Sequence, residues 1–128
     1  MFGAGDAPRG VGMIQVSGGC HCGAVRFSCE ADLSTVLECN CSHCSKKGFL
    51  LVFVPQQQFR LTSGEDKLTE YRFNKHVIAH QFCSVCGVQP HGFGKMPDGT
   101  ETAAINARCI DDVDLGSLNR VPYDGASA

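Results

Sequence analysis

The sequence predicts a mostly β protein, and two observations support this expectation. Apolar and polar residues alternate with a period of two in several short stretches, which is typical of half-buried strands. An apolar period of 3.6 residues, which would indicate an amphipathic helix, does not persist over about ten residues at any point. The 128 residues suffice for a substantial core, and no repeat or low-complexity linker divides them. We therefore expect one domain over residues 13–128, after a flexible Gly- and Ala-rich leader at 1–12.

The first half of the domain is expected to contain four short strands. Ile14–Gly19 is extended and ends in two glycines, while Ala24–Glu30 alternates in polarity and Thr35–Glu38 is a further short strand. Phe49–Val54 is apolar throughout and is stopped by Pro55, which predicts a strand covered on both faces.

The middle of the chain is predicted to form a β-hairpin. Phe59–Thr62 and Lys67–Phe73 both alternate in polarity, and the turn-forming residues Ser63–Asp66 separate them.

The last part of the chain is expected to contain three more strands. Val77–Phe82 precedes a cysteine pair, and Val88–Phe93 follows it, although Pro90 places that segment at an edge or a bulge. Thr102–Ile110 is the last long strand, and one short helical turn is expected at Asp114–Leu118.

Charge and composition exclude several functional classes. The net charge is −2 and no basic patch dominates, which argues against electrostatic binding of nucleic acid. No apolar run approaches the length of a membrane span, and the N-terminus lacks a secretory signal, so we expect a cytoplasmic protein. Disulfides are disfavoured in that reducing compartment.

Cysteines supply the strongest signal in the sequence. Seven of the nine stand in three short cysteine motifs, which we call knots and which read CHC, CNCSHC and CSVC. Thiols spaced by one or two residues in a reducing compartment are typical of metal ligands. Four thiolates close a tetrahedral zinc site, whereas three leave one position open. Seven ligands therefore predict one structural zinc and a second zinc that can take part in chemistry.

The two outer knots are paired by the glycine that follows each of them. Gly23 and Gly87 come directly after the last cysteine of their knots, where a positive φ lets the chain turn around the sulfurs. We therefore predict a closed structural zinc site formed by Cys20, Cys22, Cys83 and Cys86.

The central knot then provides a second site that is one ligand short. Its cysteines are Cys39, Cys41 and Cys44, and Ser45 follows them in place of a glycine. A fourth ligand is available in principle from His43, His80, His91 or Cys109. We expect the position to stay open, so that this second zinc is the more labile. A zinc with three thiolates is electron-rich and suits the binding and activation of another sulfur.

Four motifs in this order resemble the glutathione-dependent formaldehyde-activating enzyme family, also called the Gfa or centromere protein V family. They read GGCHCGAVRF, CNCSHCSKKG, FCSVCG and INARCIDD, and the resemblance extends from Ile14 to Leu118. It implies a zinc-braced β-tent with the same division of the cysteines into two sites. It also implies a carbon–sulfur lyase that joins glutathione to formaldehyde to give S-(hydroxymethyl)glutathione at the central zinc.

A glutathione substrate also suggests which side chains bind it. Glutathione carries two carboxylates. Lys46 and Lys47 come just after the central knot, from where their side chains can reach these carboxylates, and Arg108 is a further candidate. The chain departs from many family members at Ser45, where a basic residue is common, and at Asn40, where histidine is common. Either difference bears on the identity of the substrate.

Two other functions remain open at this stage. A fourth protein ligand on the second zinc would favour a zinc-stabilised binding or scaffold module without turnover. A thiol redox enzyme that uses Cys109 or a central cysteine is the other alternative, because methionine sulfoxide reductases of the B type have a similar zinc-braced β fold.

Overall fold

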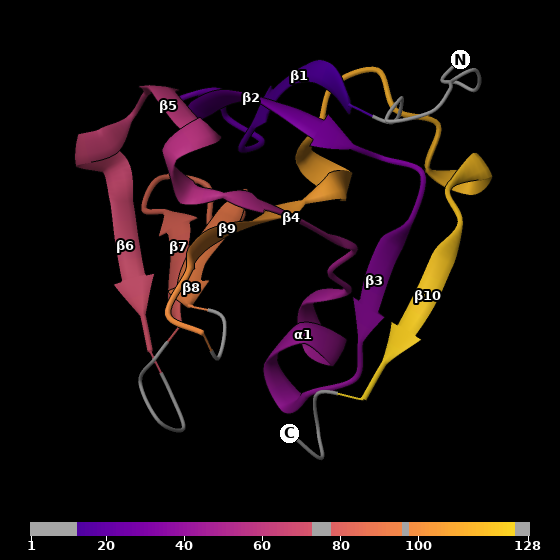
Figure 1. Cartoon of the computed structure of the whole chain (residues 1–128). Coiled ribbons are helices and arrows are strands. Elements are labelled where there is room, and N and C mark those ends of the chain that lie inside the picture. Colours follow the sequence, from indigo (N-terminus) through magenta and orange to yellow (C-terminus); the bar gives the residue numbers. More distant parts are fainter. Residues whose placement is uncertain (1–12, 73–77, 96–97, 125–128) are drawn as a thin grey trace.

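The computed structural model describes residues 13–72, 78–95 and 98–124 (Figure 1). The expected leader at 1–12 lies outside these residues. The described chain consists mostly of short strands in two sheets, with one six-residue α-helix. The predicted mostly β class is therefore confirmed.

The smaller sheet has three antiparallel strands in the order β1–β2–β5. Their bounds are Met13–Gly19 for β1, Arg26–Asp32 for β2 and Arg60–Ser63 for β5. In Figure 1, β1 and β2 cross the top of the molecule.

The larger sheet has seven strands, and β10 and β6 form its two edges (Figure 1). Only β10 and β3 run parallel, and the other neighbouring strands are antiparallel. In spatial order the strands are β10 (Arg120–Tyr123), β3 (Val36–Cys39), β4 (Leu51–Pro55), β9 (Glu101–Asn106), β8 (His91–Lys95), β7 (Ala79–Cys83) and β6 (Leu68–Tyr71).

Short helical segments connect the strands. Helix α1 (Ser42–Lys47) follows β3, and Gly48 ends it in the left-handed conformation at φ 69°. The 3-10 turns are η2 (Gln56–Gln58), η3 (Glu65–Lys67), η4 (Ala107–Cys109) and η5 (Leu115–Ser117). The last of them lies within the helical turn expected at residues 114–118.

The main hydrophobic core lies between the two sheets. Phe27 of β2 is fully buried and stacks on Phe59 at 5.4 Å between ring centroids. Ile105 of β9 enters the same core, as does Leu50, which directly precedes β4. Cys29 also lies in this core, and burial raises the pKa of its thiol to about 11, so it serves as a small apolar side chain.

The expectation that both faces of the fourth strand are covered is wrong. Val52 and Val54 of β4 are buried, but Phe53 between them is 47% exposed. Neighbouring side chains in a strand point to opposite faces, and only one face of β4 contacts the core.

The predicted hairpin is also wrong, although both of its strands exist. β5 pairs with β2 in the smaller sheet, whereas β6 pairs with β7 in the larger one. Gly64 (φ 86°) and η3 redirect the chain between them. A Cβ at Gly64 would lie 2.2 Å from the carbonyl oxygen of Ala24, so the missing side chain permits this crossover.

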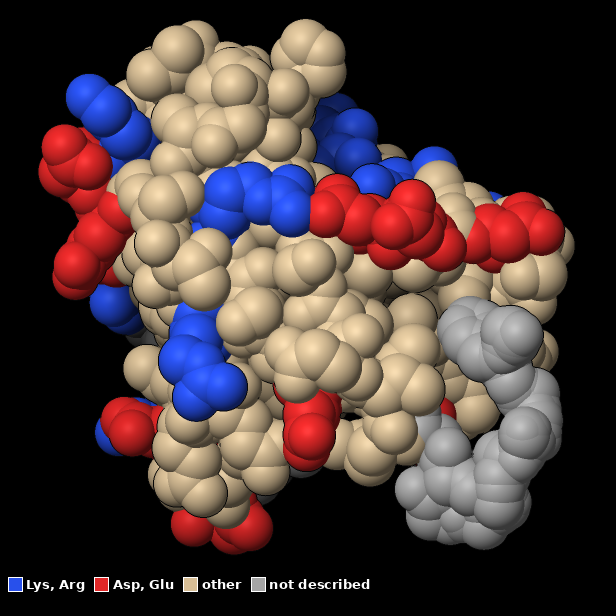
Figure 2. All heavy atoms as spheres, turned by 90° about the horizontal axis from the view of Figure 1, so that it is seen from above, with Lys and Arg blue, Asp and Glu red and all other residues tan. Residues whose placement is uncertain are grey.

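Surface charge is consistent with the composition. Figure 2 shows acidic and basic side chains on the same upper face, and neither sign covers it. Within the described residues, no helix is both long and apolar enough to cross a membrane.

Candidate metal centres

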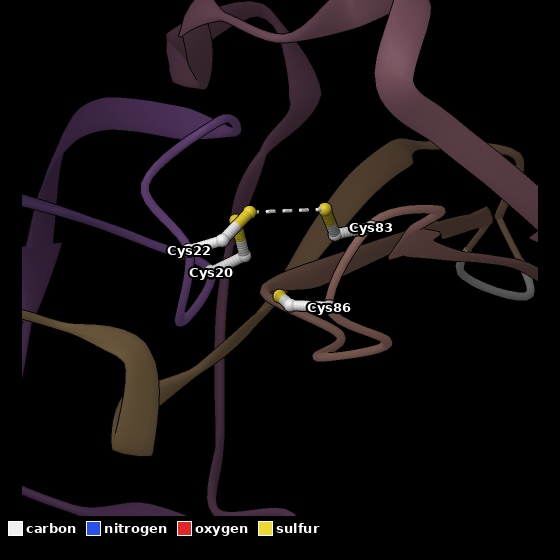
Figure 3. Close-up of side chains that lie close together, drawn as sticks. All are labelled: Cys20, Cys22, Cys83 and Cys86. Carbon is white, nitrogen blue, oxygen red and sulfur yellow. Dashed lines mark hydrogen bonds between the residues drawn. The ribbon is translucent and has the colours of Figure 1, made fainter.

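The outer cysteines meet at the junction of the two sheets. Cys20 and Cys22 lie in the turn between β1 and β2, while Cys83 ends β7 and Cys86 lies in the turn that follows it. Figure 3 shows the four side chains pointing toward one another. Their sulfur atoms all lie within 4.8 Å of one another.

The sulfur separations fit a tetrahedral zinc ion. Cys22 Sγ lies 3.7 Å from both Cys20 Sγ and Cys83 Sγ. With Zn–S bonds of about 2.3 Å, the edge of a tetrahedron of sulfurs is about 3.8 Å. A disulfide needs a separation of about 2.05 Å, and all nine cysteines, each in a described part of the chain, are free thiols.

Main-chain groups around these sulfurs favour thiolates. The Val25 N–H donates to Cys20 Sγ at 3.3 Å. The main-chain N–H of Val88 helps to lower the pKa of the Cys86 thiol to about 6. Such N–H···S hydrogen bonds support the anionic form that binds metal.

The two glycines adopt the backbone conformation that the sequence predicted for them. Gly23 has φ 84° and Gly87 has φ 83°. This left-handed region is one that residues with a Cβ rarely occupy, so these glycines close the turns that carry Cys22 and Cys86.

The central cysteines form a second cluster around the start of α1. Cys39 ends β3, Cys41 is the N-cap of the helix, and Cys44 lies in its first turn. Their sulfurs lie within 4.8 Å of one another. The Cys41 N–H donates to Cys39 Sγ at 3.5 Å, and the Cys44 N–H donates to Cys41 Sγ at 3.3 Å. Burial raises the pKa of the Cys44 thiol, so this sulfur is neutral unless a cation binds it.

Among the described residues, no fourth side chain of a ligand type joins the central cluster. The His43 ring turns toward β7 and lies 4.0 Å from the His80 ring, centroid to centroid. His43 also packs against Phe49 and Tyr71, with ring centroids 5.7 Å away in each case.

The two remaining candidates for a fourth ligand have other contacts. His91 Nε2 donates to Gln81 Oε1 at 2.8 Å, and the His91 ring packs on Phe59. The Cys109 thiol donates to the main-chain oxygen of Gln89 at 3.7 Å, and burial raises its pKa to about 11. A thiol that stays neutral at physiological pH is a poor redox nucleophile.

The three basic candidates differ in their surroundings. Lys47 Nζ donates to Gln89 Oε1 at 3.3 Å, and partial burial lowers the pKa of Lys47. Arg108 Nε donates to the carbonyl oxygen of Gly48 at 2.7 Å, so this side chain holds the end of α1. All three residues are exposed, and Lys46 precedes Lys47 on the last turn of the helix.

A cavity of about 530 Å³ lies on the other face of the larger sheet. Gln81 lines it, whereas its strand neighbour His80 points to the face that carries α1. Its lining consists of Gln56, Phe59, Leu61, Glu65, Leu68, Glu70, Gln81 and Phe93 and includes none of the predicted site residues.

Gln89 is the residue of this region that the sequence did not single out. It lies within the predicted strand at 88–93, but the structure places it before β8, where it is buried and contacts both α1 and β7. The following Pro90 signalled an irregular segment but did not indicate its contacts.

The fold and the two clusters together define a mostly β protein with a four-cysteine and a three-cysteine site of metal-binding type. The family model for glutathione-dependent formaldehyde-activating enzymes matches residues 15–121, and the chain belongs to that family. The chain is also similar to a Rhodobacter sphaeroides protein of known crystal structure, with 28% identity and a TM-score of 0.74. That match covers 84% of this chain and 98% of the other. The resemblance seen in the sequence is thereby confirmed.

Proposed function

We propose that this protein is a zinc-dependent carbon–sulfur lyase that joins glutathione to formaldehyde and forms S-(hydroxymethyl)glutathione. Its family supports glutathione-dependent formaldehyde activation in general. The observation that carries the finer proposal is the central cluster, where three sulfurs converge without a fourth ligand among the described residues.

Two zinc ions per chain fit the donor sets. Cys20, Cys22, Cys83 and Cys86 would hold the structural ion, and Cys39, Cys41 and Cys44 the second. A zinc ion with an open position lowers the pKa of a thiol that binds there, so that the thiolate predominates at neutral pH.

The rest of the site would bind and orient the thiol. The glutathione sulfur would add to the aldehyde carbon. A carbon–sulfur bond forms as the carbonyl π bond breaks, and the aldehyde oxygen takes up a proton. Lys46 and Lys47 lie on the last turn of the helix that carries Cys44, where their charges would attract the glutathione carboxylates. Arg108 contributes mainly by holding Gly48 at the end of that helix.

The deciding experiment combines binding and turnover. Glutathione should bind the zinc-loaded protein with release of a proton, which calorimetry in two buffers of different ionisation enthalpy measures. Exchange NMR should show faster formation of the adduct than in buffer, without a change in the equilibrium.

Cys41→Ser should lose the second metal, the proton release and the activity. Cys109→Ser, the same change outside both clusters, is the matched control and should keep all three. Undiminished binding in Cys41→Ser would favour the scaffold function, and loss of activity in Cys109→Ser would favour the redox function.

A further inference from the structure

Gln89 connects the helix of the central cluster to the larger sheet. It is 5% exposed, and both ends of its amide are engaged. Its Oε1 accepts from Lys47 Nζ at 3.3 Å, and its Nε2 donates to His80 Nδ1 at 3.3 Å. Its main-chain oxygen accepts from Asn106 Nδ2 at 3.1 Å and from the Cys109 thiol at 3.7 Å.

The chemistry of these partners fixes the orientation of the amide. A lysine ammonium can only donate, so the oxygen of Gln89 must face Lys47 and the NH₂ group must face His80. His80 can accept because its ring is neutral: burial, with the nearby charges of His43 and Lys47, lowers its pKa to about 4.

This arrangement places the ammonium of Lys47, a residue of the helix that carries Cys44, against β7. Lys47 lies three residues after Cys44 and four after His43, so all three share one side of α1. The His43 and His80 rings meet at 4.0 Å, and Lys47 Nζ lies 5.2 Å from the centre of the Phe82 ring. Lys47 is an exposed residue, but its ammonium contacts both Gln89 and Phe82 of β7, and these two contacts orient it.

The partners of Lys47 leave its positive charge uncompensated. Within the described residues, no carboxylate lies within ion-pair distance of Lys47. A neutral amide and an aromatic face orient the ammonium without cancelling its charge. Gln89 accepts from one of the three N–H groups of the Lys47 ammonium, so the ammonium can still donate to an anion.

We propose that Gln89 is a positioning residue that aims the Lys47 ammonium at a carboxylate of the thiol substrate. This inference rests on the proposed function and adds a determinant of specificity: the site prefers thiols that carry a carboxylate. Gln89 itself does not touch the substrate.

The test compares glutathione with cysteamine, a thiol that has no carboxylate. Gln89→Met keeps a similar volume but removes both side-chain hydrogen bonds. It should weaken glutathione binding about 3- to 10-fold, which corresponds to one hydrogen bond, and leave cysteamine binding and zinc content unchanged. In a Lys47→Met background, the same Gln89→Met change should have no further effect, because Gln89 acts through Lys47.

Equal weakening for both thiols, or the same loss with and without Lys47, would overturn the positioning role. If Gln89→Met does not fold, Gln89→Glu decides, since its carboxylate would neutralise Lys47 and should weaken glutathione binding alone. Unchanged or tighter glutathione binding in Gln89→Glu would contradict the inference. If the wild-type protein binds neither thiol, the proposed function fails, and the role of Gln89 fails with it.

Discussion

At the scale of single residues, His91 shows how burial sets the charge of a side chain. It is 1% exposed, and its Nε2 donates to Gln81 Oε1. Within the described chain, His91 Nδ1 has no hydrogen-bond partner. Burial lowers the pKa of His91 to about 4, because a charged ring would lose its hydration.

The neutral His91 predicts a pH dependence of stability. In the unfolded chain this ring gains a proton below about pH 6.5, whereas in the folded protein it does so only near pH 4. The unfolded state therefore binds more protons in this window, and stability is lost as the pH falls through it. The loss attributable to His91 is about 3 kcal/mol. Between pH 6.5 and pH 4, the free energy of unfolding of His91→Gln should fall by correspondingly less than that of the wild type at equal metal content.

Long-range ¹⁵N–¹H NMR checks the same ring directly. It should find the proton of the neutral ring on Nε2 and a protonation midpoint near pH 4. A ring that titrates near 6.5, or one protonated on Nδ1, would contradict this account.

Lys46 and Lys47 carry the second prediction at this scale. Replacing both by alanine should weaken glutathione binding by about 1–2 kcal/mol at low salt, because two cations near the central cluster would be lost. Lys67→Ala is the matched control, since this lysine is exposed beside Asp66 on η3. Isothermal titration measures both, and equal affinity in the double variant would remove these lysines from the site.

At the scale of elements, α1 depends on its ends, because a six-residue helix is not stable alone. The Cys41 side chain accepts from the Cys44 N–H and so caps the helix. The capping sulfur is also one of the three proposed metal ligands.

This double use of Cys41 separates two substitutions. Serine is a good N-cap, so Cys41→Ser should lose the second metal and keep the cap, whereas Cys41→Ala should lose both. We expect the alanine variant to be less stable than the serine variant by about 1 kcal/mol, because an N-cap contributes that much. Urea unfolding of the two proteins without the second metal measures the difference, and equal midpoints would show that the cap adds nothing.

Most strands were predictable from local pattern, but β10 (Arg120–Tyr123), which contains Pro122, was missed, and the partners of the strands were not predictable. Alternation located β5 and β6 correctly, yet the crossover at Gly64 puts them in different sheets, and this depends on a close backbone approach that no local pattern records. Helix α1 was missed because a helix of six residues is too short to show a period. The parallel pairing of β10 with β3 is likewise a long-range contact.

The candidate sites were more predictable than the topology. Cysteine spacing identified the three knots, because ligand spacing is a local property of each, and the glycines after the outer two paired them as the structure does. The contacts of Lys47 could not be inferred, since Gln89 and Phe82 approach it from distant parts of the chain.

At the scale of the whole molecule, the outer cluster ties the two sheets together. Cys22 and Cys83 are 61 residues apart, and they belong to the turn between β1 and β2 and to the end of β7. Gly18 of β1 also forms an isolated antiparallel bridge with Ile110, which follows η4. A metal at this cluster would therefore close a long loop and stabilise the contact between the two sheets.

The two proposed metals should for this reason leave the protein at different stages. Three ligands would hold the central ion and four would hold the outer one, so a graded chelator titration should remove the central zinc first. A colorimetric zinc assay should then find one zinc per chain lost without a change in circular dichroism. Loss of the outer zinc should coincide with unfolding, because a structural zinc contributes on the order of 10 kcal/mol.

Cys86→Ser should reproduce that second stage by giving insoluble or molten protein, whereas Cys41→Ser should reproduce the first. A soluble Cys86→Ser variant that unfolds cooperatively with unchanged metal content would refute the structural assignment, and simultaneous loss of both metals would refute the difference between the sites.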